Sequence, residues 1–210
     1  MGAKLETLLD IRSGVYVVTT SGGTRHVVDL ERGSATRYGA PGRAWGHHSS
    51  PDGAADGEPF YFTRIQDAAV GERMYLFSKG GYVESDYWRL TSAVASIEEM
   101  TFDLASAQAA WGIDDEQLAV VIGCSAVDIE RWKSSGVSVE RRGAVIDYVM
   151  ATEVLSKIEG ASVETLVREE NVEGLSILEV ASGETSVVLY ALAMSLASEK
   201  GSSEGVDRLS

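Results

Sequence analysis

Cysteine and long apolar runs are nearly absent from this 210-residue chain. Cys124 is the single cysteine, so the chain cannot form an internal disulfide or a metal site built on several cysteines. The apolar runs are too short to cross a bilayer, and residues 1–12 lack the extended apolar segment of a secretory signal. We therefore expect a cytoplasmic protein that does not enter a membrane.

Histidine is also scarce, which limits the catalytic and metal chemistry open to the chain. His26 falls in a predicted strand, and His47 and His48 are neighbours in a predicted loop, so no convergent set of ligands is expected. No histidine lies in the half of the chain that holds Cys124, so that thiol lacks a base to activate it. No glycine-rich phosphate loop is present either. We expect no enzyme activity, no cofactor and no metal.

Positive charge is the third scarcity. Lys and Arg number 18 against 32 Asp and Glu, which gives a net charge of −14, and most of the excess lies in residues 101–210. A typical DNA-binding domain is basic, so this acidity predicts weak non-specific binding to DNA. Four cations nevertheless cluster within a dozen residues: Arg131, Lys133, Arg141 and Arg142.

Proline is confined to one segment. All three prolines lie within residues 39–59, together with five glycines, which predicts a long surface loop. Residues 1–12 are predicted to be a short helix or a lead-in. Short β-branched and aromatic segments separated by turn residues predict six strands, at 15–20, 25–30, 34–38, 60–65, 73–79 and 87–97. Together they predict a small antiparallel sheet or a partly closed barrel.

Aromatic residues are spread along these predicted strands: Tyr61, Phe62, Tyr75, Tyr87 and Trp88. We expect them to pack in the core, because alternate residues of a strand face inward. A sheet surface on which bases stack is the alternative.

From Met100 the spacing of apolar residues changes from two to 3.6, which predicts helices. Beyond the central motif described next, helices are predicted around residues 104–111 and over 141–159, 163–167 and 185–197. The predicted fold class is therefore α+β. A small antiparallel β domain at 1–100, with its loop at 39–59, is followed by an all-α helix-turn-helix domain at 101–200 and a flexible tail at 201–210.

Residues 114–133 have the spacing of two short helices joined by a tight turn. Asp114 with Gln117, and Ser125 with Asp128, match the capping-box pattern at the start of each helix. Gly123 is predicted to end the first helix in a left-handed conformation. Apolar residues at helical spacing are predicted to hold the two helices together: Leu118, Ala119, Ile122, Ile129 and Trp132.

This layout is that of a helix-turn-helix, in which the second helix enters the major groove of DNA. The residues predicted to face the groove are Ser125, Ala126, Asp128, Ile129 and Arg131, with Ile129 partly in the core. The residues predicted to contact phosphates are Lys133, Arg141 and Arg142. An ordinary helical hairpin in a helical core is the alternative.

Two resemblances follow from these residues. Leu118-Ala119, Gly123, Ser125, Ile129 and Trp132 resemble the helix-turn-helix of bacterial and phage regulators. The segment from Asn171 to Gly183, with Gly174 and Leu178, is similar to the toxin-binding end of the Xre/MbcA/ParS-type antitoxins, although the usual proline is absent. That resemblance implies a dimer that binds DNA and a protein partner.

We expect a non-enzymatic, sequence-specific, DNA-binding transcriptional regulator of bacterial or phage origin. Its expected partners are double-stranded DNA, a second copy in a homodimer, and a protein such as a toxin or a host protein. One alternative is a protein-binding antitoxin or adaptor whose acidic surface binds its partner. Another is a phage protein that mimics DNA through its negative charge.

Overall fold

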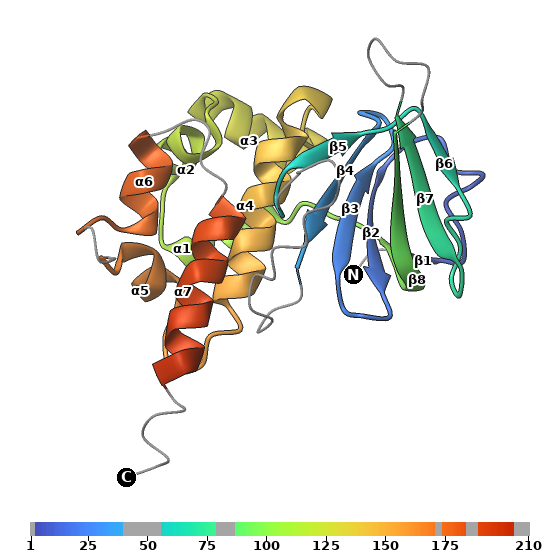
Figure 1. Cartoon of the computed structure of the whole chain (residues 1–210). Coiled ribbons are helices and arrows are strands. Elements are labelled where there is room, and N and C mark those ends of the chain that lie inside the picture. The colour runs from blue at the N-terminus through green and yellow to red at the C-terminus, as the bar shows by residue number, and fades with distance from the viewer. Residues whose placement is uncertain (1–2, 40–55, 79–86, 171–173, 184–188, 204–210) are drawn as a thin grey trace. The chain divides into compact units, whose positions relative to one another are not determined.

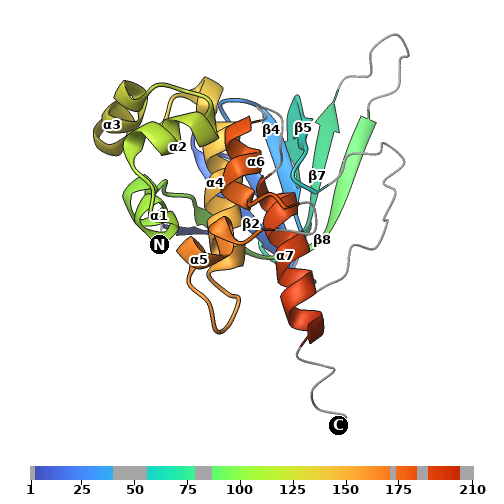
Figure 2. The ribbon, with the colours of Figure 1, turned by 90° about the vertical axis from the view of Figure 1, so that its left-hand side faces the viewer.

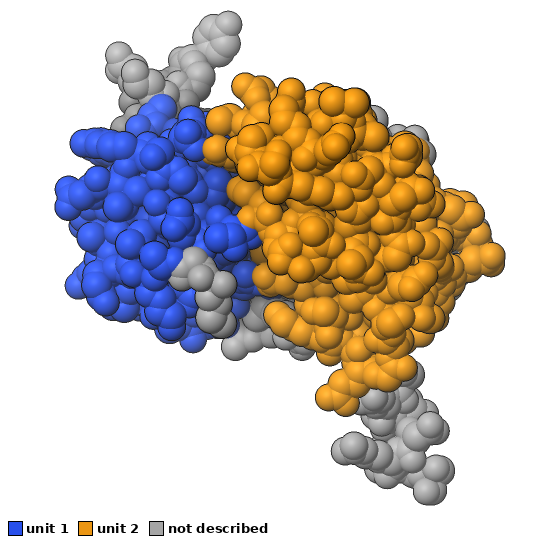
Figure 3. Space-filling model, turned by 180° about the vertical axis from the view of Figure 1, so that it is seen from behind, with its two compact units in different colours: residues 1–101 blue, residues 102–210 orange. Residues whose placement is uncertain are grey.

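The computed structural model describes residues 3–39, 56–78, 87–170, 174–183 and 189–203, and Figure 1 shows its ribbon. The chain divides into two compact units, Met1–Thr101 and Phe102–Ser210, which Figure 3 colours separately. Most of the predicted loop at 39–59, including His47 and His48, lies outside the described residues, as does the predicted tail from residue 204.

The first unit is built on an antiparallel sheet with eight strands among its described residues. The strands are β1 (Lys4–Leu5), β2 (Val15–Thr20), β3 (Arg25–Asp29), β4 (Ser34–Tyr38), β5 (Pro59–Tyr61), β6 (Arg64–Gln66), β7 (Arg73–Ser78) and β8 (Tyr87–Glu99). Their order is β5-β4-β3-β2-β8-β7-β6. β8 is long enough to pair with β7 through its first half and with β2 and β1 through its second half.

The sheet curls because its two ends are tied together by the chain. β5 and β6 stand at opposite ends of the strand order, yet only Phe62 and Thr63 separate them. Three residue steps reach no more than about 11 Å, whereas the same seven strands laid flat would span roughly 29 Å. The amide of Phe62 donates to Gly33 O at 2.7 Å, and that of Thr63 donates to Phe77 O at 2.7 Å. Figure 1 shows the resulting curvature.

The core of this unit lies inside the curl. Val28 of β3, Val18 of β2, Ile97 of β8 and Met74 of β7 belong to one cluster of buried side chains. Because alternate residues of a strand face opposite sides of the sheet, the residues between them face outward. Once the core residues of a strand are known, their neighbours in sequence are the side chains on the outer face of the sheet.

The predicted fold class is wrong. The chain is a mixed α/β protein in which the eight-stranded, curled antiparallel sheet is the dominant feature, rather than a small β domain followed by an all-α helix-turn-helix domain. Residues 1–12 contain β1, whose Lys4 and Leu5 pair with Glu98 and Ile97 of β8. The single strand predicted over 60–65 is two strands, β5 and β6, which pair with different neighbours.

The second unit is helical over most of its described residues. Its helices are α1 (Leu104–Trp111), α2 (Asp115–Ile122), α3 (Ala126–Ser135), the 3-10 helix η1 (Val139–Arg141), α4 (Arg142–Leu155), α5 (Val163–Arg168), α6 (Ile177–Gly183) and α7 (Leu189–Ser203). α4 lies at the middle, in contact with α1, α2, α5 and α7 (Figure 2). None of the helices in the described part of the chain has the length and apolarity that a bilayer crossing requires.

Buried aromatic side chains anchor α1 on α4. Trp111 is fully buried, and its ring centroid lies 4.8 Å from that of Tyr148. The indole Nε1–H donates to Thr152 Oγ1 at 2.8 Å, so the polar atom of this large side chain is satisfied. α1 ends at Gly112, directly before the segment that begins α2.

Candidate nucleic-acid interface

The first helix of the predicted motif begins and ends as its sequence predicts. Asp114 Oδ1 accepts from the amide of Gln117 at 2.8 Å, and Gln117 Oε1 accepts from the amide of Asp114 at 3.1 Å. This reciprocal capping box satisfies two amides that a helix start leaves without partners. Gly123 ends α2 in the left-handed region, with φ of 73°. The predicted start and stop of α2 are confirmed.

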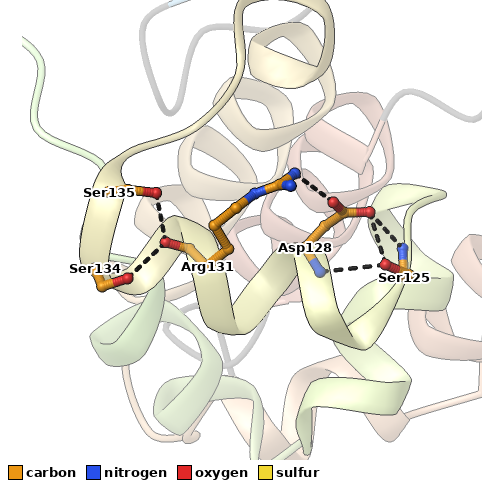
Figure 4. A network of polar contacts seen from close by, with 5 residues as sticks. All are labelled: Ser125, Asp128, Arg131, Ser134 and Ser135. Atoms are coloured by element: carbon orange, nitrogen blue, oxygen red, sulfur yellow. Dashed lines mark hydrogen bonds and ion pairs between the residues drawn. The ribbon is translucent and has the colours of Figure 1, made fainter.

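The second helix, α3, has its own capping box, shown in Figure 4. The amide of Asp128 donates to Ser125 Oγ at 3.2 Å, and Asp128 Oδ2 accepts from the Ser125 amide at 3.2 Å and hydroxyl at 2.7 Å. The hydrogen bonds from Ser125 hold the pKa of Asp128 below its usual value. The start of α3 is therefore fixed in position at neutral pH.

The turn between α2 and α3 is compact. The amide of Cys124 donates to Ala119 O at 2.9 Å. This hydrogen bond closes the C-terminal end of α2. The Cys124 side chain is half-buried, and desolvation raises the pKa of its thiol. A thiol with a raised pKa is a poor nucleophile at neutral pH. Cys124 thus acts here as a small side chain in the turn.

An apolar seam joins the two helices. Leu118 and Ile129 are fully buried, and Ala119 and Trp132 nearly so. Ala119 has a small side chain where the helices approach each other. Ile129, one of the residues predicted to face a groove, belongs wholly to this seam, so it has no surface to present to DNA.

The outward side of α3 carries the remaining predicted residues. Ser125 and Arg131 are exposed, and Ala126 and Asp128 are half-buried. Val127 is 71% exposed, the largest value among the described large hydrophobic residues, and the sequence reasoning missed it. Its position two residues after the Ser125 cap is the signal that could have identified it, because early residues of a recognition helix approach the bases.

Carboxylates of the same surface neutralise the cations of α3. Arg131 Nη2 pairs with Asp128 Oδ1 (Figure 4). Lys133 Nζ lies 2.6 Å from Asp115 Oδ1, which also accepts from Gln108 Nε2 at 2.6 Å. The hydrogen bonds from Lys133 and then Gln108 lower the pKa of Asp115. The local charge is therefore close to neutral rather than strongly positive.

The predicted phosphate contacts lie next to the turn and at the start of α4. Arg141 is exposed, and a Cβ added at Gly123 would lie 3.8 Å from its Nη1, so its guanidinium lies beside the turn. Arg142 is half-buried at the first position of α4. Lys133 and Arg141 thus lie near α3, whereas Arg142 has less surface to offer.

A third capping box lies in the segment that resembles the antitoxins. Glu179 Oε2 accepts from the amide of Ser176 at 2.8 Å, and the amide of Glu179 donates to Ser176 Oγ at 3.2 Å. This box starts α6, which ends at Gly183. Asn171 lies outside the described residues.

Over the residues that the structure describes, no three His, Cys, Asp or Glu side chains come together as a site for a metal ion. No protein-family model matches the chain, and no curated protein is detectably similar to it in sequence.

Proposed function

We propose that the protein is a non-enzymatic, sequence-specific regulator that binds double-stranded DNA by placing α3 in the major groove. In this proposal it acts in the cytoplasm of a bacterium, or of a bacterium infected by a phage that encodes it. The observation that carries the proposal is the exposed outer side of α3, held on a support fixed by two capping boxes and a buried seam.

The outward side of α3 suits base edges in the major groove. Val127 and Ala126 offer apolar contacts of the kind that a thymine methyl group makes. Arg131 offers a guanidinium that can donate two hydrogen bonds to guanine. Ser125 supplies a hydroxyl at the N-terminal end of α3. Backbone amides at such an end can also bind a DNA phosphate.

The ion pairs of α3 do not prevent this use. An exposed ion pair contributes only about 0–1 kcal/mol, because water screens it and holding two side chains together costs entropy. Phosphates can therefore draw Arg131 and Lys133 away from Asp128 and Asp115 at small cost. The carboxylates left behind are repelled by DNA, which keeps non-specific affinity low.

Few phosphate contacts per copy imply that two copies act together. Each copy offers Lys133 and Arg141 to DNA phosphates, and Arg131 if its side chain turns to the DNA backbone. This gives at most about three phosphate contacts for each copy. A homodimer on a palindromic site doubles that number and adds a second set of base contacts. The dimer is therefore part of the proposal.

A gel shift with a duplex containing the protein's own promoter tests the proposal. We expect Arg131→Ala to weaken binding by about 1–3 kcal/mol, because it removes a bidentate base contact. Lys157→Ala is the matched control. Lys157 is an exposed cation that follows the C-terminal end of α4, outside the helix-turn-helix motif. A shift that Arg131→Ala leaves unchanged would contradict the role of α3.

A second candidate function is a protein-binding antitoxin or adaptor. The observation that favours it is the pairing of Arg131 and Lys133 with carboxylates, in a half of the chain with net charge of −11. Such a surface suits a basic protein partner such as a toxin. Absence of promoter binding together with salt-sensitive capture of one basic protein would favour this candidate.

A further inference from the structure

The outer face of β6 and β7 carries aromatic rings that the core does not use. Tyr75 and Phe77 alternate with Met74 and Leu76, which are buried in the core, so the two rings lie on the other face of β7. Their ring centroids are 6.4 Å apart and their planes are inclined by only 16°. The expectation that Tyr75 packs in the core is therefore wrong.

Arginine side chains accompany these rings. The guanidinium carbon of Arg64, from β6, lies 4.4 Å from the centroid of the Phe77 ring, its register partner across the strands. Arg64 and Arg73 are both exposed, and neither forms an ion pair with a described residue. Arg64 therefore combines a contact with the half-buried Phe77 ring and a guanidinium that no described carboxylate neutralises.

A second arginine–aromatic pair lies at β5, which a two-residue link joins to β6. The Arg32 guanidinium lies 5.8 Å from the centroid of the Tyr61 ring, and Arg32 Nη2 donates to Tyr61 Oη at 3.1 Å. Tyr61 is 52% exposed, although its sequence suggested the core. Only Phe62 and Thr63 separate Tyr61 from Arg64.

Charge is distributed unevenly along this surface. Asp67, which accepts from Gln66 Nε2 at 3.1 Å, and Glu72 lie at the end of β6–β7 that holds Arg73. The other end holds Arg64 and, beyond the link, Arg32. An anionic ligand would therefore bind at the end that holds Arg64.

We propose that the outer surface formed by Arg32, Tyr61, Arg64, Tyr75 and Phe77 binds single-stranded nucleic acid. Unpaired bases present flat faces that stack on aromatic rings without regard to sequence, and guanidinium groups pair with the phosphates between them. A duplex cannot bind in this way because its base faces are covered by their neighbours. This surface is separate from α3 and does not depend on the duplex binding proposed above.

Fluorescence anisotropy with labelled oligo(dT) and oligo(U) of about 20 nucleotides, which exceeds a typical binding site, measures this interaction at low and moderate salt. We expect the wild-type protein to bind one or both, and an unlabelled duplex to compete poorly. Phe77→Ile and Arg64→Gln should each weaken binding about tenfold, in keeping with the loss of a stacked base or a phosphate contact.

Two variants control for the location of the site, and one measurement separates binding from folding. Arg12→Gln removes an exposed charge elsewhere in the same unit, and Arg131→Ala alters the proposed duplex site; neither should change oligo(dT) binding. Thermal unfolding reports whether Phe77→Ile disturbs the sheet. If it does, Arg64→Gln still tests the surface, because Arg64 is exposed. No binding by the wild-type protein, binding unaffected by both variants, or equal competition by the duplex would overturn the proposal.

Discussion

Gly123 is the residue on which the α2–α3 turn depends most directly. Its φ of 73° lies in the left-handed region, and a Cβ there would meet nothing closer than Arg141 Nη1 at 3.8 Å. Space is therefore available, and the cost of any other residue is backbone strain. Gly22 provides a comparison, because its φ does not lie in the left-handed range and a Cβ would meet only Thr20 Oγ1 at 3.9 Å.

We expect Gly123→Ala to lower the free energy of unfolding by about 1–2 kcal/mol, because alanine is strained in the left-handed conformation. Gly22→Ala should leave it unchanged or raise it slightly, because it removes freedom from the unfolded chain. Urea denaturation of both variants measures the difference. Equal effects of the two substitutions would argue against a strained turn.

Asp147 is a buried acid whose pKa is shifted by its surroundings. Its carboxylate, on α4, accepts from the amide of Leu189 at 2.6 Å and from that of Tyr190 at 3.4 Å, at the start of α7. Burial raises its pKa to about 7, although these two hydrogen bonds oppose the shift. An acid whose pKa is raised on folding binds its proton more tightly in the folded state.

The folded protein is therefore expected to lose stability as the pH rises from about 4 to about 7, by no more than about 4 kcal/mol from this group. The stabilising contribution is complete below the unfolded pKa and is lost as the pH passes through the folded pKa. Asp147→Asn should flatten this part of the profile in urea denaturation at pH 5 and pH 8. The same fall in stability in the asparagine variant would assign it to other groups.

At the scale of elements, capping patterns predicted the starts of α2 and α3 correctly, whereas the helix predicted over 141–159 ends at Leu155 and the one predicted over 185–197 extends to Ser203. Strand partners were predicted poorly. The capping boxes at Asp114 and Ser125 were readable because each depends on residues three apart. The Ser176–Glu179 box has the same spacing and was overlooked. By contrast, nothing local in Phe60–Ile65 reveals that its two ends pair with β4 and β7, because that division depends on residues far away in sequence.

The candidate site shows the same division between local and distant information. Helical spacing places Ile129 on the side that faces α2, yet only the packed structure shows that none of its surface remains exposed. The alternation along β7 was visible in sequence, but which of its faces is the core was not. Tyr75 was therefore predicted to face inward and lies outward.

The Ser125 cap gives a prediction at this scale. Ser125→Ala removes the acceptor for the Asp128 amide and should cost about 0.5–2 kcal/mol of stability. Ser134→Ala is the control, because the Arg131 carbonyl that Ser134 bonds at 2.9 Å also accepts from Ser135 at 2.8 Å. Urea unfolding followed by tryptophan fluorescence compares them. A larger loss in Ser134→Ala would contradict the importance of the cap.

At the scale of the whole molecule, the two compact units differ in charge as well as in structure. The first hundred residues carry −3 and the remainder −11. Each unit is compact and contains buried apolar residues, as an independently folding domain does. The two nucleic-acid surfaces proposed above also fall in different units, so they can be tested separately.

We expect residues 102–210 to fold without the first unit. Circular dichroism of this fragment should show a helical spectrum with cooperative thermal unfolding, and Trp111 should remain in an apolar environment. The full-length chain is the reference. A fragment with the spectrum of an unfolded chain would show that the helical unit requires the sheet.

The central claim is that α3 reads the sequence of a DNA duplex. Selection of bound duplexes from a random pool by the full-length protein tests this claim directly. The account predicts enrichment of a palindrome whose half-sites are centred about 10–10.5 base pairs, or a multiple of that, apart. It also predicts that Val127→Ala and Arg131→Ala change the preferred bases. A pool that shows no enrichment, or variants that both enrich the same sequence as the wild-type protein, would contradict it.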